Sequence, residues 1–384
     1  MKRIVILGST GSIGRSTLDV VDRFPDAYDV VGLAAGRNAD LLIRQIQTYK
    51  PRIVSFARKQ DAERFIARGR VSEMQVVWGE EGAEEVGVSG DADIVISAIT
   101  GIFGLRPTMA ALEAGRTVAL ANKESMVVAG PLFQSVMERS GARIIPVDSE
   151  HSGVFQCLAG EPESQVHRVI LTASGGPFFR TPVSELESID LEQALSHPRW
   201  KMGKKVTIDS ATMMNKGLEL IEARWLFGLR PDQLDVLIHP QSIVHSLVEM
   251  RDGSVLAQLS PTDMKIPIQY ALTYPLRGEP LLPRLDLAAA GNLEFHPVDR
   301  NKFPLFDLAR EALVEGASLP VAMNAANEAA VEAFLERRIK FLDIYEIVKT
   351  VMDQHRKTEL HSLDEIFEVN REGGDLARNN IEKR

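Results

Sequence analysis

A glycine-rich turn near the start of the chain constrains its fold more than any other stretch. The apolar run at 2–7 reads as a strand, the sequence GSTGSIG occupies 8–14, and an amphipathic stretch covers 15–24. In such a strand–turn–helix, glycines allow the tight turn, the close approach of a pyrophosphate and close packing of the helix. The spacing G-x-x-G-x-x-G departs from the strict dinucleotide pattern, so a glycine turn without a ligand is the alternative.

The segments that follow alternate between strand and helix patterns. Strands are predicted at 29–34, 53–56, 94–98, 117–121 and 143–147, with helical patterns between them, notably at 105–114 and 131–140. Alternation of this kind favours an α/β fold with a Rossmann-like, doubly wound parallel sheet. We expect the first domain, residues 1–150, to bind a nucleotide at the carboxyl edge of this sheet.

The residues after the second predicted strand indicate which nucleotide binds. An NAD site usually has an acidic residue there for the ribose hydroxyl, whereas this chain has Gly36, Arg37 and Asn38. A guanidinium pairs with a 2′-phosphate, so NADP(H) is favoured over NAD(H). A plain surface cation is the alternative. The triplet 122–124 (NKE) follows another strand and is a candidate for contact with the nicotinamide ribose, or ordinary loop polarity.

Two carboxylates, Asp148 and Glu150, follow the strand at 143–147. A spacing of two in an extended chain puts them on the same side. Carboxylates held together repel each other unless a proton or cation intervenes, and Mg²⁺ or Mn²⁺ prefers such oxygen ligands. The alternative is a solvated acidic loop.

The middle of the chain holds a second group of polar residues. A strand at 169–172 leads into the turn 174–178 (SGGPF), and the segment 196–203 (SHPRWKMG) has the composition of a mobile lid. In this lid segment Trp200 would cover an apolar ring and Gly203 would act as the hinge. The alternative is that Trp200 packs in a core or at a domain interface.

A predicted helix at 213–227 carries Asn215, Lys216 and Glu219 on one face, with Ser210 at its entry. Hydroxyl, amide and ammonium groups at a helix start suit a phosphate, and Glu219 would reach a metal. Alternatively, Lys216 and Glu219 form a plain ion pair on the helix surface.

The remaining pattern predicts two further domains. Strands at 234–238, 243–249 and 254–259 indicate a mixed or antiparallel sheet in an α+β catalytic domain over 151–285, and residues 275–283 read as an extended proline-rich connection. His239 and His245 fit structural roles better than ligand roles. A linker at 286–311 and helices at 308–314, 322–337, 342–355 and 363–367, the last followed by a charged tail, indicate a C-terminal helical domain over 312–384.

Composition excludes several classes of protein. A formal net charge of −9 argues against a general nucleic-acid surface, and a single cysteine, Cys157, rules out an intrachain disulfide or a zinc–thiolate site. The sequence has no run near the roughly 18 apolar residues of a membrane span, and no signal peptide pattern. We expect a cytoplasmic protein.

The motifs together resemble one family, the 1-deoxy-D-xylulose 5-phosphate (DXP) reductoisomerases. The resemblance covers essentially the whole chain and is carried by residues 8–14, 121–125, 147–151, 174–178, 197–200, 209–219 and 238–242. It implies an NADP-dependent oxidoreductase of the non-mevalonate (MEP) isoprenoid pathway. Such an enzyme rearranges DXP and reduces it with NADPH to 2-C-methyl-D-erythritol 4-phosphate. A homodimer is also implied, with a sugar phosphate as substrate and neither nucleic acid nor membrane as partner.

The resemblance also implies roles for individual residues. The metal ligands would be Asp148, Glu150 and Glu219, holding Mg²⁺ or Mn²⁺, with Co²⁺ as a further candidate. These three, His197 and Lys216 would be catalytic. Substrate would touch Ser149, Glu150, Ser174, His197, Ser210, Asn215, Lys216 and Glu219. NADPH would touch Thr10, Gly11, Ser12, Ile13, Gly36, Arg37, Asn38, Asn122, Lys123, Glu124 and Gly203.

Two other functions fit parts of the pattern. An NADP-dependent dehydrogenase of a small acid, of the homoserine or semialdehyde type, would need the glycine turn but no site with three carboxylates. A redox sensor that binds NADP without chemistry would need no phosphate site beside those carboxylates.

Overall fold

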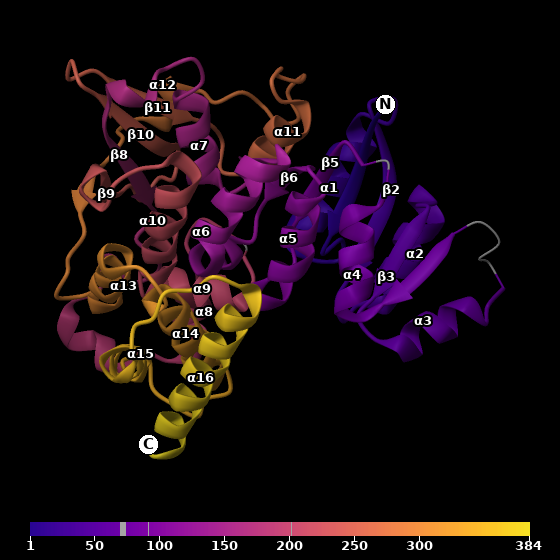
Figure 1. Ribbon diagram of the computed structural model, residues 1–384. Coiled ribbons are helices and arrows are strands. Elements are labelled where there is room, and N and C mark those ends of the chain that lie inside the picture. The colour runs from indigo at the N-terminus through magenta and orange to yellow at the C-terminus, as the bar shows by residue number, and fades with distance from the viewer. Residues whose placement is uncertain (70–73, 91, 201) are drawn as a thin grey trace. The chain divides into compact units, whose positions relative to one another are not determined.

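The computed structural model describes residues 1–69, 74–90, 92–200 and 202–384 (Figure 1). The chain forms two compact units, each made of segments that are distant in sequence. Unit 1 comprises residues 1–125, 131–152 and 263–283, and unit 2 comprises residues 126–130, 153–262 and 284–384. Among the described residues, no helix combines the length and the apolar character needed to cross a membrane.

Unit 1 is built on a parallel sheet. In the part of the chain that the structure describes, the seven strands lie in the order β4-β3-β2-β1-β5-β6-β7. From β1 the chain adds β2, β3 and β4 on one side and then returns to add β5, β6 and β7 on the other. The change of side, between β1 and β5, is the switch point of a doubly wound sheet. This confirms the predicted fold class. The strands are β1 (Lys2–Leu7), β2 (Tyr28–Ala35), β3 (Ile53–Phe56), β4 (Gln75–Trp78), β5 (Ile94–Ser97), β6 (Thr117–Leu120) and β7 (Arg143–Pro146).

Helices connect these strands. They are α1 (Ser12–Arg23), α2 (Ala39–Tyr49), α3 (Lys59–Ile66), α4 (Gly79–Val88), α5 (Leu105–Glu113) and α6 (Lys123–Ser140). The helix α4 packs beside α5, and α1 packs beside α11 (Lys265–Thr273). Central strands such as β1 are almost completely buried at Ile4, Val5, Ile6 and Leu7, as a sheet covered on both faces requires.

Helix α11 was not predicted from the sequence, where Pro267 within a short apolar stretch obscured it. Proline is tolerated in the first turn of a helix, and Pro267 lies in that turn. The Lys265 ammonium lies 3.0 Å from an Asp19 carboxylate oxygen, and Lys2 Nζ donates to the Leu272 carbonyl at 2.7 Å. These contacts attach α11 to the rest of unit 1.

Unit 2 contains a mixed sheet, as predicted. Its order is β11-β10-β8-β9-β12, in which β8 and β9 are parallel and the other pairs are antiparallel. The strands are β8 (Val166–Ala173), β9 (Leu234–Ile238), β10 (Val244–Met250), β11 (Val255–Leu259) and β12 (His296–Pro297).

The helices of unit 2 fall into two groups. The first consists of α8 (Leu191–Leu195), α9 (Lys204–Ala211), α10 (Met214–Phe227) and α12 (Leu287–Ala290). The second is the predicted C-terminal helical region: α13 (Pro304–Glu315), α14 (Leu319–Leu335), α15 (Asp343–Gln354) and α16 (Leu363–Glu382). Short 3-10 helices occur at Gly101–Gly104, Glu163–Gln165, Val183–Ser188 and Pro231–Gln233. Helix α14 is the buried centre of this region and packs against α9, α15 and α16 (Figure 1).

Three local predictions were wrong. Helix α7 (Ser149–Cys157) begins directly after Asp148, so residues 148–150 are not an extended chain. Ser210 was predicted at the entry to the helix that carries Asn215, but it lies in the last turn of α9, and Met213 with a left-handed φ of 63° separates α9 from α10. Helix α16 continues through the predicted charged tail, because packing of Gly373 against Ala322 of α14 offsets the poor helix propensity of glycine.

The two units also divide the chain differently from the predicted domains. Residues 263–283 belong with the seven-stranded sheet, and residues 284–384 belong with the mixed sheet. The predicted boundaries at 150, 285 and 311 therefore stay predictions. Part of the predicted linker is helical, since α13 starts at Pro304.

Candidate active site

The glycine turn of unit 1 has no room for side chains. Gly8 has a φ of +91°, and a Cβ on it would lie 2.5 Å from the Ala98 carbonyl oxygen. A Cβ on Gly14 would lie 2.3 Å from the Gly8 carbonyl oxygen. The Gly11 N–H donates to the same oxygen at 3.0 Å, and α1 begins at Ser12. This turn brings the start of a helix to the carboxyl end of β1, an arrangement that favours anion binding.

Most of the predicted NADPH contacts lie at this edge of the sheet. Parallel strands end at the same edge, and the residues in question follow β1, β2 and β6. Asn38 and Asn122 begin helices: their Oδ1 atoms accept from Leu41 N at 3.0 Å and Ser125 N at 3.3 Å. The predicted NADPH contacts that lie at this edge are Thr10, Gly11, Ser12, Ile13, Gly36, Arg37, Asn38, Asn122, Lys123 and Glu124. Gly203 belongs to unit 2, where it precedes α9.

Asp148 and Glu150 lie in the connection from β7 into α7, at the same edge. The Lys123 ammonium forms an ion pair with Asp148, and both side chains are largely buried. Asp148 Oδ1 accepts from Ser149 N at 2.9 Å, and Ser149 Oγ donates to Glu150 Oε2 at 2.5 Å. Oxygens of the two carboxylates lie within 4.8 Å of each other. The start of α7 thus brings them together, although not by the extended geometry predicted.

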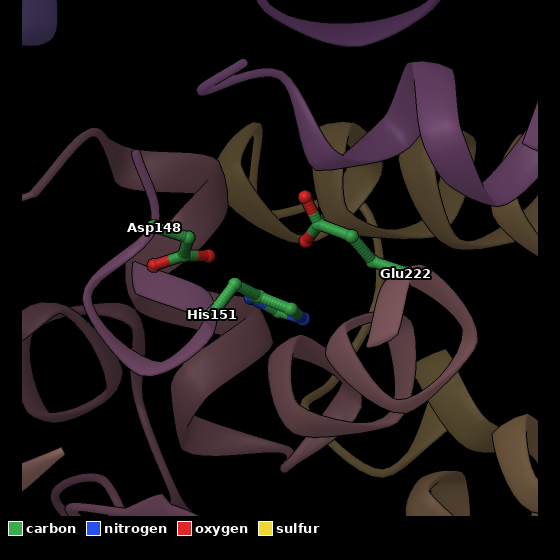
Figure 2. Close-up of side chains that lie close together, drawn as sticks. All are labelled: Asp148, His151 and Glu222. Atoms are coloured by element: carbon green, nitrogen blue, oxygen red, sulfur yellow. The ribbon is translucent and has the colours of Figure 1, made fainter. Parts of the chain in front are cut away.

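Two buried titratable residues, His151 and Glu222, were not singled out from the sequence. Figure 2 shows His151 on the first turn of α7, after Asp148, and Glu222 on α10. A His151 ring nitrogen and an Asp148 carboxylate oxygen lie within 4.8 Å. Both His151 and Glu222 are 0% exposed. Their sequence positions could have identified them. Glu222, for example, follows Glu219 by three residues on the same helix.

In unit 2, one face of α10 carries a buried charged network. Asn215 Nδ2 donates to Glu219 Oε1 at 2.5 Å, and the Lys216 ammonium pairs with Glu219 Oε2. Lys216 is 3% exposed and Glu219 is 1% exposed. This burial excludes the alternative of a plain surface ion pair. Because burial of charges is costly, such a pair is weak evidence for stability and stronger evidence for a site.

Ser174 and His197 are brought together although 23 residues separate them. Ser174 follows β8, and its Oγ lies 3.0 Å from His197 Nε2. Burial lowers the pKa of the His197 ring to about 4, so the ring is neutral at physiological pH.

The turn after β8 also packs against the end of α9, which carries Ser210. A Cβ on Gly176, whose φ is +63°, would lie 2.6 Å from the Ser210 carbonyl oxygen. The preceding residue, Asp209, is 1% exposed; its oxygens accept from Asn327 Nδ2 at 2.8 Å and lie 2.9 Å from the Lys205 ammonium. The bond from Asn327 to Asp209 joins α14 to α9.

The lid segment (residues 196–203) contains Lys201, which lies outside the described residues. Trp200 is half-buried, and its ring centroid lies 6.5 Å from that of His245. His239 has a structural role: its Nδ1 faces the Glu294 carbonyl at 2.8 Å, its Nε2 accepts from Ile243 N at 3.2 Å, and its ring stacks on Phe295.

Comparison with known proteins decides the family. Residues 4–130 match the family described as 1-deoxy-D-xylulose 5-phosphate reductoisomerase, and residues 144–227 and 259–375 match its C-terminal domains. The reductoisomerase of Pelotomaculum thermopropionicum is 49% identical over 374 residues, which are 97% of this chain and 96% of that protein. The chain belongs to the DXP reductoisomerase family.

Solved DXP reductoisomerases have the same fold. The enzyme from Zymomonas mobilis, in complex with NADPH, is 40% identical and covers 100% of each chain with a TM-score of 0.94. A second DXP reductoisomerase, solved with NADPH, fosmidomycin and magnesium, is 38% identical and also has a TM-score of 0.94. The match covers 100% of this chain and 98% of that one.

Proposed function

We propose that this DXP reductoisomerase converts DXP and NADPH into 2-C-methyl-D-erythritol 4-phosphate and NADP⁺ in the MEP pathway, with a divalent metal ion. Its reaction is a rearrangement of the carbon skeleton followed by reduction. The observation that carries the proposal is the buried Asn215–Lys216–Glu219 network on α10. A plain dehydrogenase would need the glycine turn of unit 1 but not this network.

NADPH would bind at the carboxyl edge of the seven-stranded sheet. The start of α1 would receive the pyrophosphate, since the glycine turn leaves its backbone N–H groups approachable. Arg37 is exposed, and no acidic residue takes the position after β2. This charge favours the 2′-phosphate of NADPH over the free hydroxyl of NADH.

The donor set fits a hard divalent cation. Asp148, Glu150 and Glu219 offer only carboxylate oxygens, which suit Mg²⁺, and we propose them as the ligands. Mn²⁺ and Co²⁺ are further candidates, since both accept oxygen ligands. When bound, the ion would polarise the substrate carbonyl and stabilise negative charge on its oxygens. Lys123 and Lys216 form ion pairs with Asp148 and Glu219 and so offset part of the negative charge at the proposed site.

Side chains of unit 2 would bind the phosphate group. Ser174, Ser210, Asn215 and Lys216 supply two hydroxyls, an amide and an ammonium, which are hydrogen-bond donors for an anion. His197 would lie beside them through its contact with Ser174. Ser149, between the two carboxylates, would contact the substrate.

The lid segment would keep water away from the reacting carbons. Trp200 offers a large apolar surface for this, and Gly203 a hinge, because a Cβ there would meet nothing within 4 Å. NADPH would supply the hydride, while the protein orients the two reactants. We also propose a homodimer in the cytoplasm.

The decisive test follows NADPH absorbance with purified protein and Mg²⁺. We expect oxidation only when DXP is present, and its loss when a chelator removes the metal. Oxidation that needs no DXP or no metal would contradict the proposal. NADH in place of NADPH should give a much lower rate, because Arg37 would have no phosphate partner.

A further inference from the structure

We propose that His197 is a positioning residue that acts through both of its ring nitrogens. Its Nδ1 holds the turn that carries Arg199 and Trp200, and its Nε2–H fixes the Ser174 hydroxyl as a donor to phosphate. The inference deepens the proposed function and rests on it for the identity of the anion.

The Nδ1 side of the ring accepts two backbone hydrogen bonds. Arg199 N donates to it at 3.2 Å and Trp200 N at 2.9 Å. A nitrogen that receives N–H groups must present its lone pair, so Nδ1 carries no hydrogen. The ring therefore closes the turn over residues 197–200 in the way that an aspartate or asparagine oxygen closes an Asx turn.

The Nε2 side must then carry the ring hydrogen. Neutral imidazole has one N–H, and with Nδ1 unprotonated that hydrogen lies on Nε2, which donates to Ser174 Oγ at 3.0 Å. Burial, which lowers the pKa of the ring, favours this neutral form. An imidazolium would carry a hydrogen on Nδ1 directed at two N–H groups.

The hydroxyl of Ser174 is polarised as a result. Its oxygen accepts from His197 Nε2 and also from Gly176 N at 3.2 Å, so both lone pairs are engaged. The hydroxyl hydrogen is left for a third partner, which must be an acceptor. An oxygen of a phosphate meets that requirement. A Ser174 hydroxyl turned the other way, with an oxygen lone pair toward the phosphate, would repel the phosphate.

One ring therefore connects the proposed phosphate site to Trp200. The turn has further attachments in unit 2: Arg199 Nε donates to the Pro240 carbonyl at 3.2 Å, and the Trp200 ring lies beside that of His245. A shift of Ser174 on phosphate binding would move the imidazole, and with it the two backbone amides. Trp200 would report the occupancy of the phosphate site.

The first test measures the ring hydrogen directly in the free protein. Two-bond ¹⁵N–¹H correlation spectra of protein labelled at histidine ring nitrogens distinguish the two tautomers, and His197→Asn identifies the signal to be assigned. We expect Nε2 protonated and Nδ1 unprotonated from pH 6 to pH 8. A hydrogen on Nδ1 would overturn the proposal, whatever the enzymatic activity.

The second test separates the two nitrogens by substitution. In His197→Asn, the amide oxygen takes the place of Nδ1 while the Nε2–H donor is lost. In His197→Gln, an amide N–H takes the place of Nε2–H while the Nδ1 acceptor is lost. Inorganic phosphate binding is measured by calorimetry, and the exposure of Trp200 by acrylamide quenching of fluorescence. The fluorescence of the same variants carrying Trp200→Phe is subtracted as background.

We expect the two variants to fail in opposite ways. His197→Asn should weaken phosphate binding by about threefold to tenfold, as for loss of one oriented hydrogen bond, and leave Trp200 quenching unchanged. His197→Gln should bind phosphate within twofold of the natural protein and roughly double the quenching of Trp200. Equal effects of both variants on both readouts would contradict separate roles. Because no readout uses DXP or NADPH, a failed reaction would not be mistaken for a failed proposal.

Discussion

The two units build their proposed sites from different materials. In unit 1 the proposed pyrophosphate site is made of backbone: Cβ atoms added at Gly8 or Gly14 would collide with main-chain atoms. Ser12 and Arg37, two polar side chains proposed to contact the nucleotide, are exposed. In unit 2 the site consists of side chains, with Lys216 and Glu219 almost fully buried and Ser174 held by His197.

This difference predicts how each site tolerates substitution. A backbone site fails when the turn cannot form, so its substitutions should cost folding free energy. A side-chain site fails when charge or hydrogen bonding changes, so its substitutions should cost activity while the fold persists. Four experiments test this contrast.

The largest effect is expected from Glu219→Gln. Loss of a buried carboxylate that is a proposed metal ligand and the partner of Lys216 should lower kcat by at least about 100-fold. NADPH binding, measured by fluorescence, should stay within a factor of about three because the nucleotide would bind in unit 1. The matched control is Glu368→Gln, which removes the carboxylate of an exposed ion pair with Arg371 at the same i, i+3 spacing. Equal losses in both variants would contradict a special role for the buried pair.

The next effect is on folding and comes from Gly14→Ala. The added Cβ would lie 2.3 Å from the Gly8 carbonyl oxygen and 2.5 Å from Ser9 Cα, both of them main-chain atoms that cannot turn aside. Urea denaturation should show a loss of about 2 kcal/mol or more in unfolding free energy. Gly36→Ala, with nothing within 4 Å of the new atom, should change it by less than about 0.5 kcal/mol. Equal stability of the two variants would contradict the conclusion that the turn has no room for a side chain at residue 14.

A smaller effect is expected from substitution of Arg37, the proposed partner of the 2′-phosphate of NADPH. Arg37→Ala should raise the KM for NADPH about tenfold and leave the rate with NADH unchanged, since only NADPH has a 2′-phosphate to lose. Because Arg37 is exposed, the melting temperature should not move. Arg23→Ala, at the exposed end of α1, serves as the control. A proportional loss with both nucleotides would show that Arg37 does not select between them.

The smallest effect is a pH dependence of stability. The folded pKa of His197 is about 4 against an ordinary value of 6.5, so between these values the unfolded chain binds more protons. Stability from this residue is complete above pH 6.5 and is lost as pH falls toward 4. The melting temperature of His197→Asn should therefore fall less steeply over that window than that of the natural protein, whereas exposed His361→Asn should not differ from it. Identical slopes for all three would contradict a half-buried neutral ring.

The sequence predicted the backbone site better than the side-chain site, for a physical reason. Strand periodicity and glycine spacing are local, so β1, β2, β5, β6 and the turn between β1 and α1 could be placed from the residues alone. The contact between Ser174 and His197 depends on how β8 and the lid segment pack, which no local pattern encodes. The partner of Lys123, Asp148, was missed for the same reason.

Helix assignments failed where tertiary packing outweighs local preference. Residues 149–157 have a weak apolar stripe but form α7, and α16 contains Gly373 and Gly374 in its interior. Glycine lets α16 approach α14 closely, since a Cβ on Gly373 would be 3.2 Å from Ala322. The charged residues after 367 were predicted to be a tail and not part of this helix. Asp209 and Asn327, 118 residues apart, are another pair that only the folded structure brings together.

The central claim is that one protein rearranges the carbon skeleton of a sugar phosphate and reduces it. The direct measurement supplies NADPH deuterated at the transferred position, together with DXP and Mg²⁺, and analyses the product by NMR and mass spectrometry. We predict a branched 2-C-methyl-D-erythritol 4-phosphate that carries one deuterium for each NADPH consumed. A deuterated product with the unbranched skeleton of DXP would contradict the account and identify a simple reductase.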